Sequence, residues 1–184
     1  MNKLFGHLKT VLTHKYYVCY YGRKMGLSLP ARLAHDLSKF HPIEFFESVK
    51  YYTGVSSPID GCKADKGYSM AWFHHRGNNR HHYEYYVDYF DDGGKPGLMP
   101  YRYALEMVCD YLAAGRAYTG KDFTIEDEIK WWEKKNAKPL LMHPAQREFV
   151  TSIFNYIKEH NYYPSKKVSK LIYEETVDNW RRTL

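Results

Sequence analysis

The sequence of 184 residues predicts an all-α fold. Apolar residues make up 44% and charged residues 26% of the chain, which is the balance of a folded globular protein. Apolar side chains recur at three- and four-residue steps, and no segment alternates apolar and polar residues as a half-buried strand would. The length suits one hydrophobic core. We therefore expect a single domain, residues 1–184, built as a bundle of six to eight helices.

Three helices are expected before the first loop. Leucines and valines recur at helical spacing from the first residues up to Gly26, which ends the pattern. In the next segment, Leu33 and Leu37 are expected to place one helix face in the core. Pro42 interrupts that segment, because the residue before a proline disfavours helical geometry. The three helices are expected at residues 2–25, 31–40 and 43–52.

The remaining chain is expected to alternate helices and loops, without strands. Residues 54–67 and 91–97 are rich in glycine, proline and polar residues, which predicts loops. Helical character resumes between them, from Ser69 to Phe90, with a break near Gly77. Further helices are expected at about 100–118, from Thr124 onward, and at about 145–160 and 165–181.

The composition indicates which atoms a metal site would use. The chain has 10 histidines and only 3 cysteines, and the cysteines lack metal-binding spacing, so any ligands should be nitrogen and oxygen. His35 and Asp36 are adjacent near an apolar face, where a buried charge needs a partner or a metal. His14 points inward from the first helix, and Asp110 lies on a small-residue face of the helix at 100–118. Taken one at a time, each of these four could instead be structural or exposed.

A second group of histidines lies between residues 71 and 86. If this segment stays helical, His75 and His82 share one face, and His74 and His81 share another. We select His75, His81 and His82 as candidate ligands of a second cation. Alternatively, this histidine cluster could form a solvated surface or a phosphate-binding patch. The role of His74 stays open, and no functional role is expected for His7, His41, His143 and His160.

The series His14, His35-Asp36 and Asp110, each on its own helix, resembles the HD-domain superfamily of metal-dependent hydrolases. In that superfamily, four such residues from an all-α core bind one divalent metal. The resemblance covers about residues 5–120, with the helices at about 124–181 packing on that core. HDLSK also looks like an HD-x-x-K form, whose lysine, here Lys39, often faces the substrate.

The histidine cluster extends the resemblance to HD proteins with two metals, although in these the extra histidines usually stand further apart. The whole pattern is also similar to a family of uncharacterised bacterial and phage proteins, a domain of unknown function.

The resemblance implies a metal-dependent phosphohydrolase that acts on a nucleotide or another small phosphate ester. One or two divalent cations, manganese, iron, cobalt, nickel or zinc, would lower the pKa of a bound water from about 15.7 to roughly 7. Lys39, Glu44 and Glu106 are candidate catalytic residues, with the carboxylates as general acid or base. Lys39, Arg76 and Arg116 are candidates for binding phosphate.

Two other functions stay open. The extra histidines suit a di-iron oxygenase of the HD type. The net charge of +6 suits a non-catalytic helical domain that binds nucleic acid or protein, although no run of lysines and arginines supports a nucleic-acid arm.

The chain lacks a long apolar span and a signal-peptide pattern, so we expect a cytoplasmic protein without membrane association. A homo-oligomer is compatible with the sequence.

Overall fold

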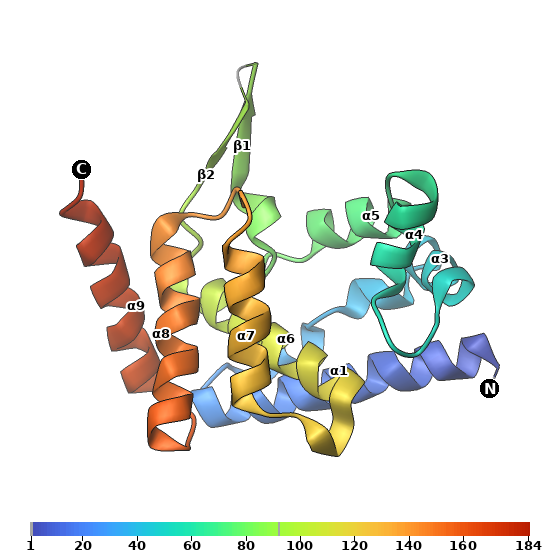
Figure 1. The fold of residues 1–184 in the computed structure, drawn as a ribbon, viewed down its shortest axis with the longest axis horizontal. Helices are drawn as coiled ribbons and strands as arrows, with labels where there is room; N and C mark the ends of the chain where they lie inside the picture. Colours follow the sequence, from blue (N-terminus) through green and yellow to red (C-terminus); the bar gives the residue numbers. More distant parts are fainter. Residues whose placement is uncertain (1, 92) are drawn as a thin grey trace.

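The structure, a computed structural model, describes residues 2–91 and 93–184 and is mostly helical (Figure 1). The all-α class is confirmed, but the described residues form nine α-helices rather than six to eight, together with one small hairpin. None of the described helices combines the length and apolar character that crossing a bilayer would take. The elements are α1 (Lys3–Met25), α2 (Leu29–Ala34), α3 (Pro42–Tyr51), α4 (Pro58–Lys66), α5 (Met70–Asn78), β1 (Val87–Phe90), β2 (Gly93–Pro96), α6 (Tyr101–Thr119), α7 (Ile125–Asn136), α8 (Pro144–His160) and α9 (Lys166–Arg181).

The hydrophobic core forms where α1 packs against α6 and the C-terminal helices cover α6. Val18 of α1, Leu112 of α6 and Phe149 of α8 are fully buried in one cluster. In Figure 1, α7, α8 and α9 stand side by side at one end of the molecule, whereas α3, α4 and α5 gather at the other end of α1. The polar site described below lies between these two groups of helices, where α5 and the segment after α2 meet α1 and α6.

Local sequence explains the long helices, whose expected positions are confirmed. Asn2 caps α1 by accepting a hydrogen bond from the backbone N–H of Leu4, and Thr124 caps α7 in the same way. Gly26 ends α1 with a φ of 82°, a conformation that favours glycine. An added Cβ there would lie 2.4 Å from the Cβ of Lys166. The end of α1 can therefore approach the start of α9 only because residue 26 has no side chain.

The expected helix through Phe40 is wrong. α2 ends at Ala34, Asp36 adopts a left-handed conformation with a φ of 55°, and a 3-10 turn follows. Leu33 and Leu37 are 59% and 55% exposed, so they do not face the core as expected. The break has a physical reason, because adjacent residues of a helix point in different directions. In this structure, the left-handed turn at Asp36 lets the side chains of both His35 and Asp36 enter one buried site.

The segments on either side of Ser69 also differ from expectation. Residues 54–67 contain the short helix α4, which begins at Pro58 and ends before Gly67. The break expected near Gly77 is confirmed, since α5 ends at Asn78, but the helix does not resume: the chain turns, forms a 3-10 turn and enters the hairpin β1–β2. The expected absence of strands and the shared helix faces of the histidine cluster are therefore wrong. Asp92, in the expected loop 91–97, lies outside the described residues.

A buried carboxyl group lies between α6 and α7. Glu128 of α7 is only 6% exposed, and it packs so closely on Gly115 of α6 that an added Cβ would lie 2.1 Å from its Oε2 atom. Burial, with a smaller contribution from the charge of Asp110, raises the pKa of Glu128 from 4.5 to about 8.

The free energy of unfolding of the metal-free protein should therefore fall between about pH 4.5 and pH 8. Over this range the unfolded chain releases the Glu128 proton while the folded state retains it, at about 1.4 kcal/mol per unit of pKa difference. Glu128→Gln should remove this decline and stabilise the protein at pH 8.5. Urea denaturation at pH 5 and pH 8.5 measures the effect, with the exposed Glu126→Gln as control. If the free energy of unfolding depended on pH equally in Glu128→Gln and Glu126→Gln, this prediction would be contradicted.

Candidate metal centre

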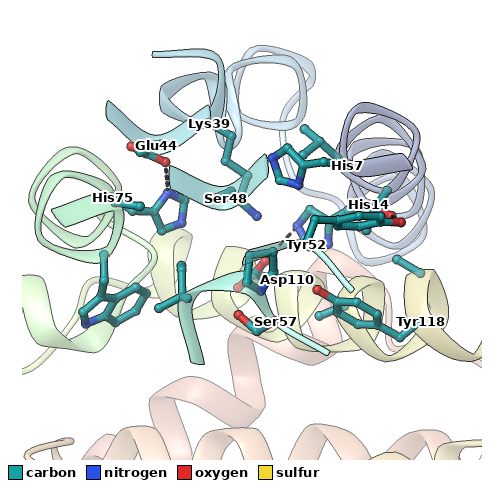
Figure 2. Close-up of a pocket in the computed structure, with 18 of the residues that line it drawn as sticks. His7, His14, Lys39, Glu44, Ser48, Tyr52, Ser57, His75, Asp110 and Tyr118 are labelled. Carbon is teal, nitrogen blue, oxygen red and sulfur yellow. Dashed lines mark hydrogen bonds and ion pairs between the residues drawn. The ribbon is translucent and has the colours of Figure 1, made fainter. Parts of the chain in front are cut away.

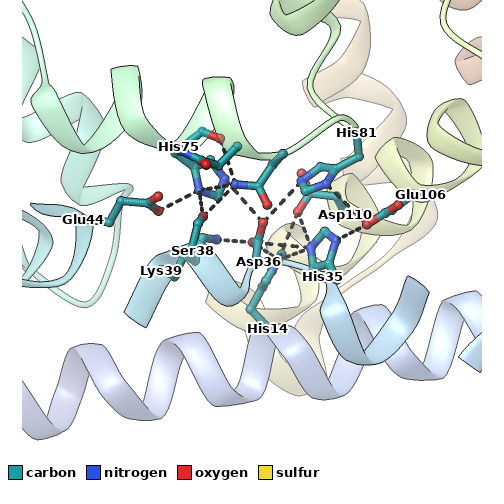
Figure 3. Close-up of polar contacts among 12 residues, drawn as sticks. His14, His35, Asp36, Ser38, Lys39, Glu44, His75, His81, Glu106 and Asp110 are labelled. Carbon is teal, nitrogen blue, oxygen red and sulfur yellow. Dashed lines mark hydrogen bonds and ion pairs between the residues drawn. The ribbon is translucent and has the colours of Figure 1, made fainter. Parts of the chain in front are cut away.

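Asp36 lies at the centre of the predicted site, and its two carboxylate oxygens face two different sets of histidines (Figure 3). Oδ2 lies 3.4 Å from Nε2 of His14 and 3.3 Å from Nε2 of His35. Oδ1 lies 3.4 Å from Nε2 of His75 and 3.3 Å from Nε2 of His81. All five residues are buried. The left-handed turn at Asp36 thus places one carboxylate between α1, α5 and the turn that follows α5.

The first group consists of the four residues that the sequence indicated: His14, His35, Asp36 and Asp110. Oδ1 of Asp110, from the middle of α6, lies 3.0 Å from Nε2 of His14 and 3.5 Å from Nε2 of His35. One potential ligand atom from each of the four lies within 4.8 Å of all the others. Helices α1 and α6 and the segment after α2 therefore bring two imidazoles and two carboxylates together, as the sequence predicted.

The second group consists of Asp36, His75, His81 and His82, whose potential ligand atoms also lie within 4.8 Å of one another. His75 comes from α5, whereas His81 and His82 come from the turn after it. Their convergence does not need a continuous helix, because the chain reverses after Asn79, whose backbone is extended. His74 is the cluster member that stays outside this group; it binds Glu44 and stacks on His41.

Three of the histidines contact a second carboxylate on the far side of the ring. Nδ1 of His35 lies 3.0 Å and Nδ1 of His81 3.4 Å from Oε1 of Glu106, and Nδ1 of His75 lies 2.8 Å from Oε2 of Glu44. The Nε2 atoms of these rings point to Asp36. A histidine that ligates a metal commonly donates its other N–H to a carboxylate in this way, which fixes the ring and its tautomer.

The pKa values of the buried groups in the site depend on their neighbours. Burial alone would lower the pKa of His35, but Asp36, Asp110 and Glu106 raise it well above its ordinary value. Burial alone would raise the pKa of Glu106, but hydrogen bonds from His35 and His81 lower it to about 2. The pKa of His82 is well below the ordinary value, because burial and the two neighbouring histidines disfavour its protonated form.

The donor set fits divalent cations. Oδ1 of Asp36 and the Nε2 atoms of His81 and His82 are buried and have no hydrogen-bond partner among the described residues, whereas Oδ2 of Asp36 is paired with Nζ of Lys39. Buried polar atoms without partners are costly, and a cation would satisfy all three. Imidazole and carboxylate ligands suit manganese, iron, cobalt, nickel or zinc. The first group could hold one ion and the second group another, with Asp36 shared between them.

A cavity of about 200 Å³ adjoins these ligands (Figure 2). Its lining includes His14, His75, His82 and Asp110 from the two groups, and also Lys39. The walls away from the ligands are largely apolar and come from α1, α3, α4, α5 and the second half of α6. A small molecule in this cavity would therefore lie directly against the candidate metal ligands.

The other predicted site residues differ in whether they line this cavity. Lys39 lines the cavity, and its Nζ lies 2.7 Å from Oδ2 of Asp36. Glu44 also lines the cavity and contacts His75, whereas Glu106 lies behind His35 and His81; both can orient the rings, and their predicted acid–base role stays a prediction. Neither Arg76 nor Arg116 is among the described residues that line this cavity. Arg76 lies over Phe73, and Arg116 lies in a separate tyrosine-rich hollow.

Sequence reasoning overlooked one residue of the cavity. His7 was expected to have no functional role, but its ring is buried and lines the cavity. The signal was present, since His7 precedes His14 by seven residues and so shares its face of α1. The hydroxyl groups of Tyr52 and Ser48 in the same cavity gave no comparable signal in the sequence.

The chain matches a family of unknown function, DUF5662, over residues 3–156. It belongs to that family. The match includes both ligand groups and the cavity and ends within α8. Comparison with curated proteins found no match, and comparison with solved structures found none either. Family membership is therefore consistent with the expected likeness to an uncharacterised family.

Titration of the metal-free protein with Mn²⁺ is expected to give two sites per chain. Asp36→Asn should weaken both sites, because both of its oxygens face ligand groups. His14→Ala should weaken only the first site and His82→Ala only the second, each by more than the roughly 10- to 100-fold typical of losing an outer partner. Calorimetry measures the affinities, with exposed Asp178→Asn as control. Unchanged binding in Asp36→Asn would contradict this assignment.

Glu106→Gln should lower the Mn²⁺ affinity of both sites by about 10- to 100-fold. Glu106 contacts His35 of the first group and His81 of the second, both through Oε1, and a neutral amide oxygen in its place would lose the charge that strengthens both hydrogen bonds. The same titration measures the effect, and exposed Glu126→Gln should bind as the unmodified protein does. An effect confined to one site would show that Glu106 orients only one histidine.

Proposed function

We propose that this protein is a metal-dependent phosphohydrolase of the HD-domain type, acting on a small phosphate ester. The observation that carries the proposal is the position of Asp36, whose two oxygens face two adjoining groups of potential ligands. The order of the residues along the chain, His14, then His35-Asp36, then Asp110, is the order typical of that superfamily. The extra histidines His75, His81 and His82 lie between the His-Asp pair and Asp110, the interval in which HD proteins with two metals carry theirs, although those usually stand further apart in sequence.

The chain's own residues have separable tasks in this reaction. When bound, the divalent cations would supply a water of lowered pKa and neutralise charge on the phosphoryl group. Lys39 lines the cavity beside Asp36 and can donate hydrogen bonds to a phosphoryl oxygen. Glu44 and Glu106 keep the rings of three histidines oriented. The water oxygen binds phosphorus and the ester P–O bond breaks; one proton of the water is transferred to the leaving oxygen and the other stays on the phosphate, so the products are an alcohol and hydrogen phosphate.

A di-iron oxygenase is the second candidate, and the composition of the second group favours it. Three histidines accompany Asp36 there, and three neutral imidazoles with one carboxylate suit iron as well as manganese. The mainly apolar cavity walls also suit a substrate of low charge. Elemental analysis separates the two candidates: two irons per chain together with oxygen consumption would favour the oxygenase.

Phosphate release from phosphate monoesters by the Mn²⁺-loaded protein tests the hydrolase. Asp36→Ala is expected to abolish it, because this change removes a ligand from both groups. Lys39→Met should lower kcat/KM by about tenfold or more while leaving the bound metal in place, since a charge-assisted hydrogen bond to phosphate is lost. Lys170→Met, at an exposed position of α9, is the control.

The hydrolase proposal would be overturned if the protein bound two metals but released no phosphate from any ester of a broad panel. A protein that binds no metal at all would overturn both candidates, and salt-sensitive nucleic-acid binding that survives in Asp36→Ala would then favour a non-catalytic binding domain.

A further inference from the structure

We infer that the cavity selects substrates with a single anionic group and an uncharged, hydroxyl-bearing body, and that His7 binds a hydroxyl of that body. The inference rests on the proposed function and names the substrate class of the same site. It depends on three features of the cavity away from the metal ligands: the position of His7, the direction of the hydrogen bonds near Tyr52, and the distribution of charge.

His7 lines the cavity but belongs to neither ligand group. It precedes His14 by two turns of α1, which places the two Cα atoms about 10 Å apart along the helix axis. Its ring is 6% exposed and packs against Phe45 and Tyr52, with ring centroids 5.4 and 5.8 Å away. In Figure 2, His7, His14 and Lys39 face the same cavity. A molecule bound at the metals and extending along α1 would therefore reach His7.

The Nδ1 atom of His7 is buried without a hydrogen-bond partner in the described part of the chain. Burial, and secondarily the charge of Lys39, lowers the pKa of His7 to about 4, so the ring is neutral at pH 7. A neutral imidazole has one donor and one acceptor nitrogen. A hydroxyl group can pair with Nδ1 in either tautomer, because it both donates and accepts. An ionised phosphate only accepts and would pair with one tautomer alone.

Hydrogen-bond directions near Tyr52 favour the same kind of ligand. The hydroxyl of Thr10 donates to the backbone carbonyl of Gly6 over 3.1 Å, and its oxygen lies 2.9 Å from the hydroxyl oxygen of Tyr52. Since Thr10 has only one hydroxyl proton, Tyr52 must donate in this pair. The oxygen of Tyr52 is then left as an acceptor at the cavity wall. It can bind a hydroxyl or an N–H group, but it would oppose the oxygens of a second phosphate.

Charge in the cavity supports one anionic group rather than several. Among the described lining residues, Lys39 is the one lysine, and no arginine is present. It stands beside Asp36 at the metal end. Outside the two ligand groups, the described lining residues other than His7, Lys39 and Glu44 are apolar or hydroxyl-bearing, including Ser48 and Ser57. A diphosphate or triphosphate would place uncompensated charge against these walls, at a high desolvation cost. A monoester places its one phosphate at the metals and an uncharged body beyond.

Steady-state hydrolysis by the full chain loaded with Mn²⁺ tests the inference. The probes are glycerol phosphate, a hexose phosphate, a nucleoside monophosphate, the matching nucleoside triphosphate, and p-nitrophenyl phosphate, which has no hydroxyl in its body. We expect kcat/KM for the best hydroxyl-bearing monoester to exceed that for the triphosphate by at least about 100-fold. His7→Phe should lower kcat/KM for that monoester at least about tenfold more than for p-nitrophenyl phosphate.

Two further variants exclude a merely structural effect. His7→Asn places a polar atom near the position of Nδ1 and should restore part of the selectivity lost in His7→Phe. His160→Phe makes the same exchange on the exposed end of α8 and should leave both rate constants unchanged. Mn²⁺ content, measured for each variant, should stay the same. Equal losses for both substrates in His7→Phe, or hydrolysis of the triphosphate as fast as that of the monoester, would overturn the inference.

Failure of the proposed function is distinguishable from failure of this inference. If metals bind but no ester is hydrolysed, the hydrolase is wrong, and calorimetric binding of the same probes to the Mn²⁺-loaded protein decides the inference. Tighter binding of the hydroxyl-bearing monoester than of the triphosphate, lost in His7→Phe, would support it. Binding without this preference would overturn it.

Discussion

The burial of one carboxylate, that of Asp36, is the constraint on which the rest of the site depends. Its exposed fraction is 0%, and its two oxygens face histidines from three separate segments of the chain. A buried carboxylate must be compensated by positive charge, by hydrogen bonds or by a metal. The histidines of the site and the ammonium group of Lys39 together provide this compensation.

Meeting the requirement distorts the local backbone. A regular helix through His35 and Asp36 would point their side chains about 100° apart, whereas the site needs both side chains inside. The end of α2 at Ala34 and the left-handed turn at Asp36 solve this problem. Non-glycine residues adopt that conformation at a cost of about 1–3 kcal/mol, and such strain persists where surrounding packing enforces it. The exposure of Leu33 and Leu37 follows from the same turn.

The carboxylates behind the histidines give the site its rigidity. Glu106 contacts one histidine of each group, so the orientation of the first group depends on that of the second. Glu44 acts in the same way on His75. These contacts leave the Nε2 atoms directed at Asp36, while the cavity beside them stays largely apolar. The candidate metal ligands thus line one part of the cavity, and apolar and hydroxyl-bearing side chains line most of the rest.

The sequence by itself determined the helical class, the long helices and the four residues of the first group. These follow from local signals: apolar side chains at helical spacing, caps at Asn2 and Thr124, and polar residues in otherwise apolar faces. His14 and Asp110 could be found because each lies within a regular helix, where spacing states which way a side chain points.

Only the tertiary structure decided how the second group forms and what Glu44, Glu106 and His7 contact. The histidines after α5 lie in an irregular turn, where sequence spacing does not determine direction. The break at Asp36 and the hairpin β1–β2 arise for the same reason, since contacts between distant segments outweigh weak local preferences there. The sequence could therefore indicate candidate ligands in both groups, but only packing could show that Asp36 faces both groups.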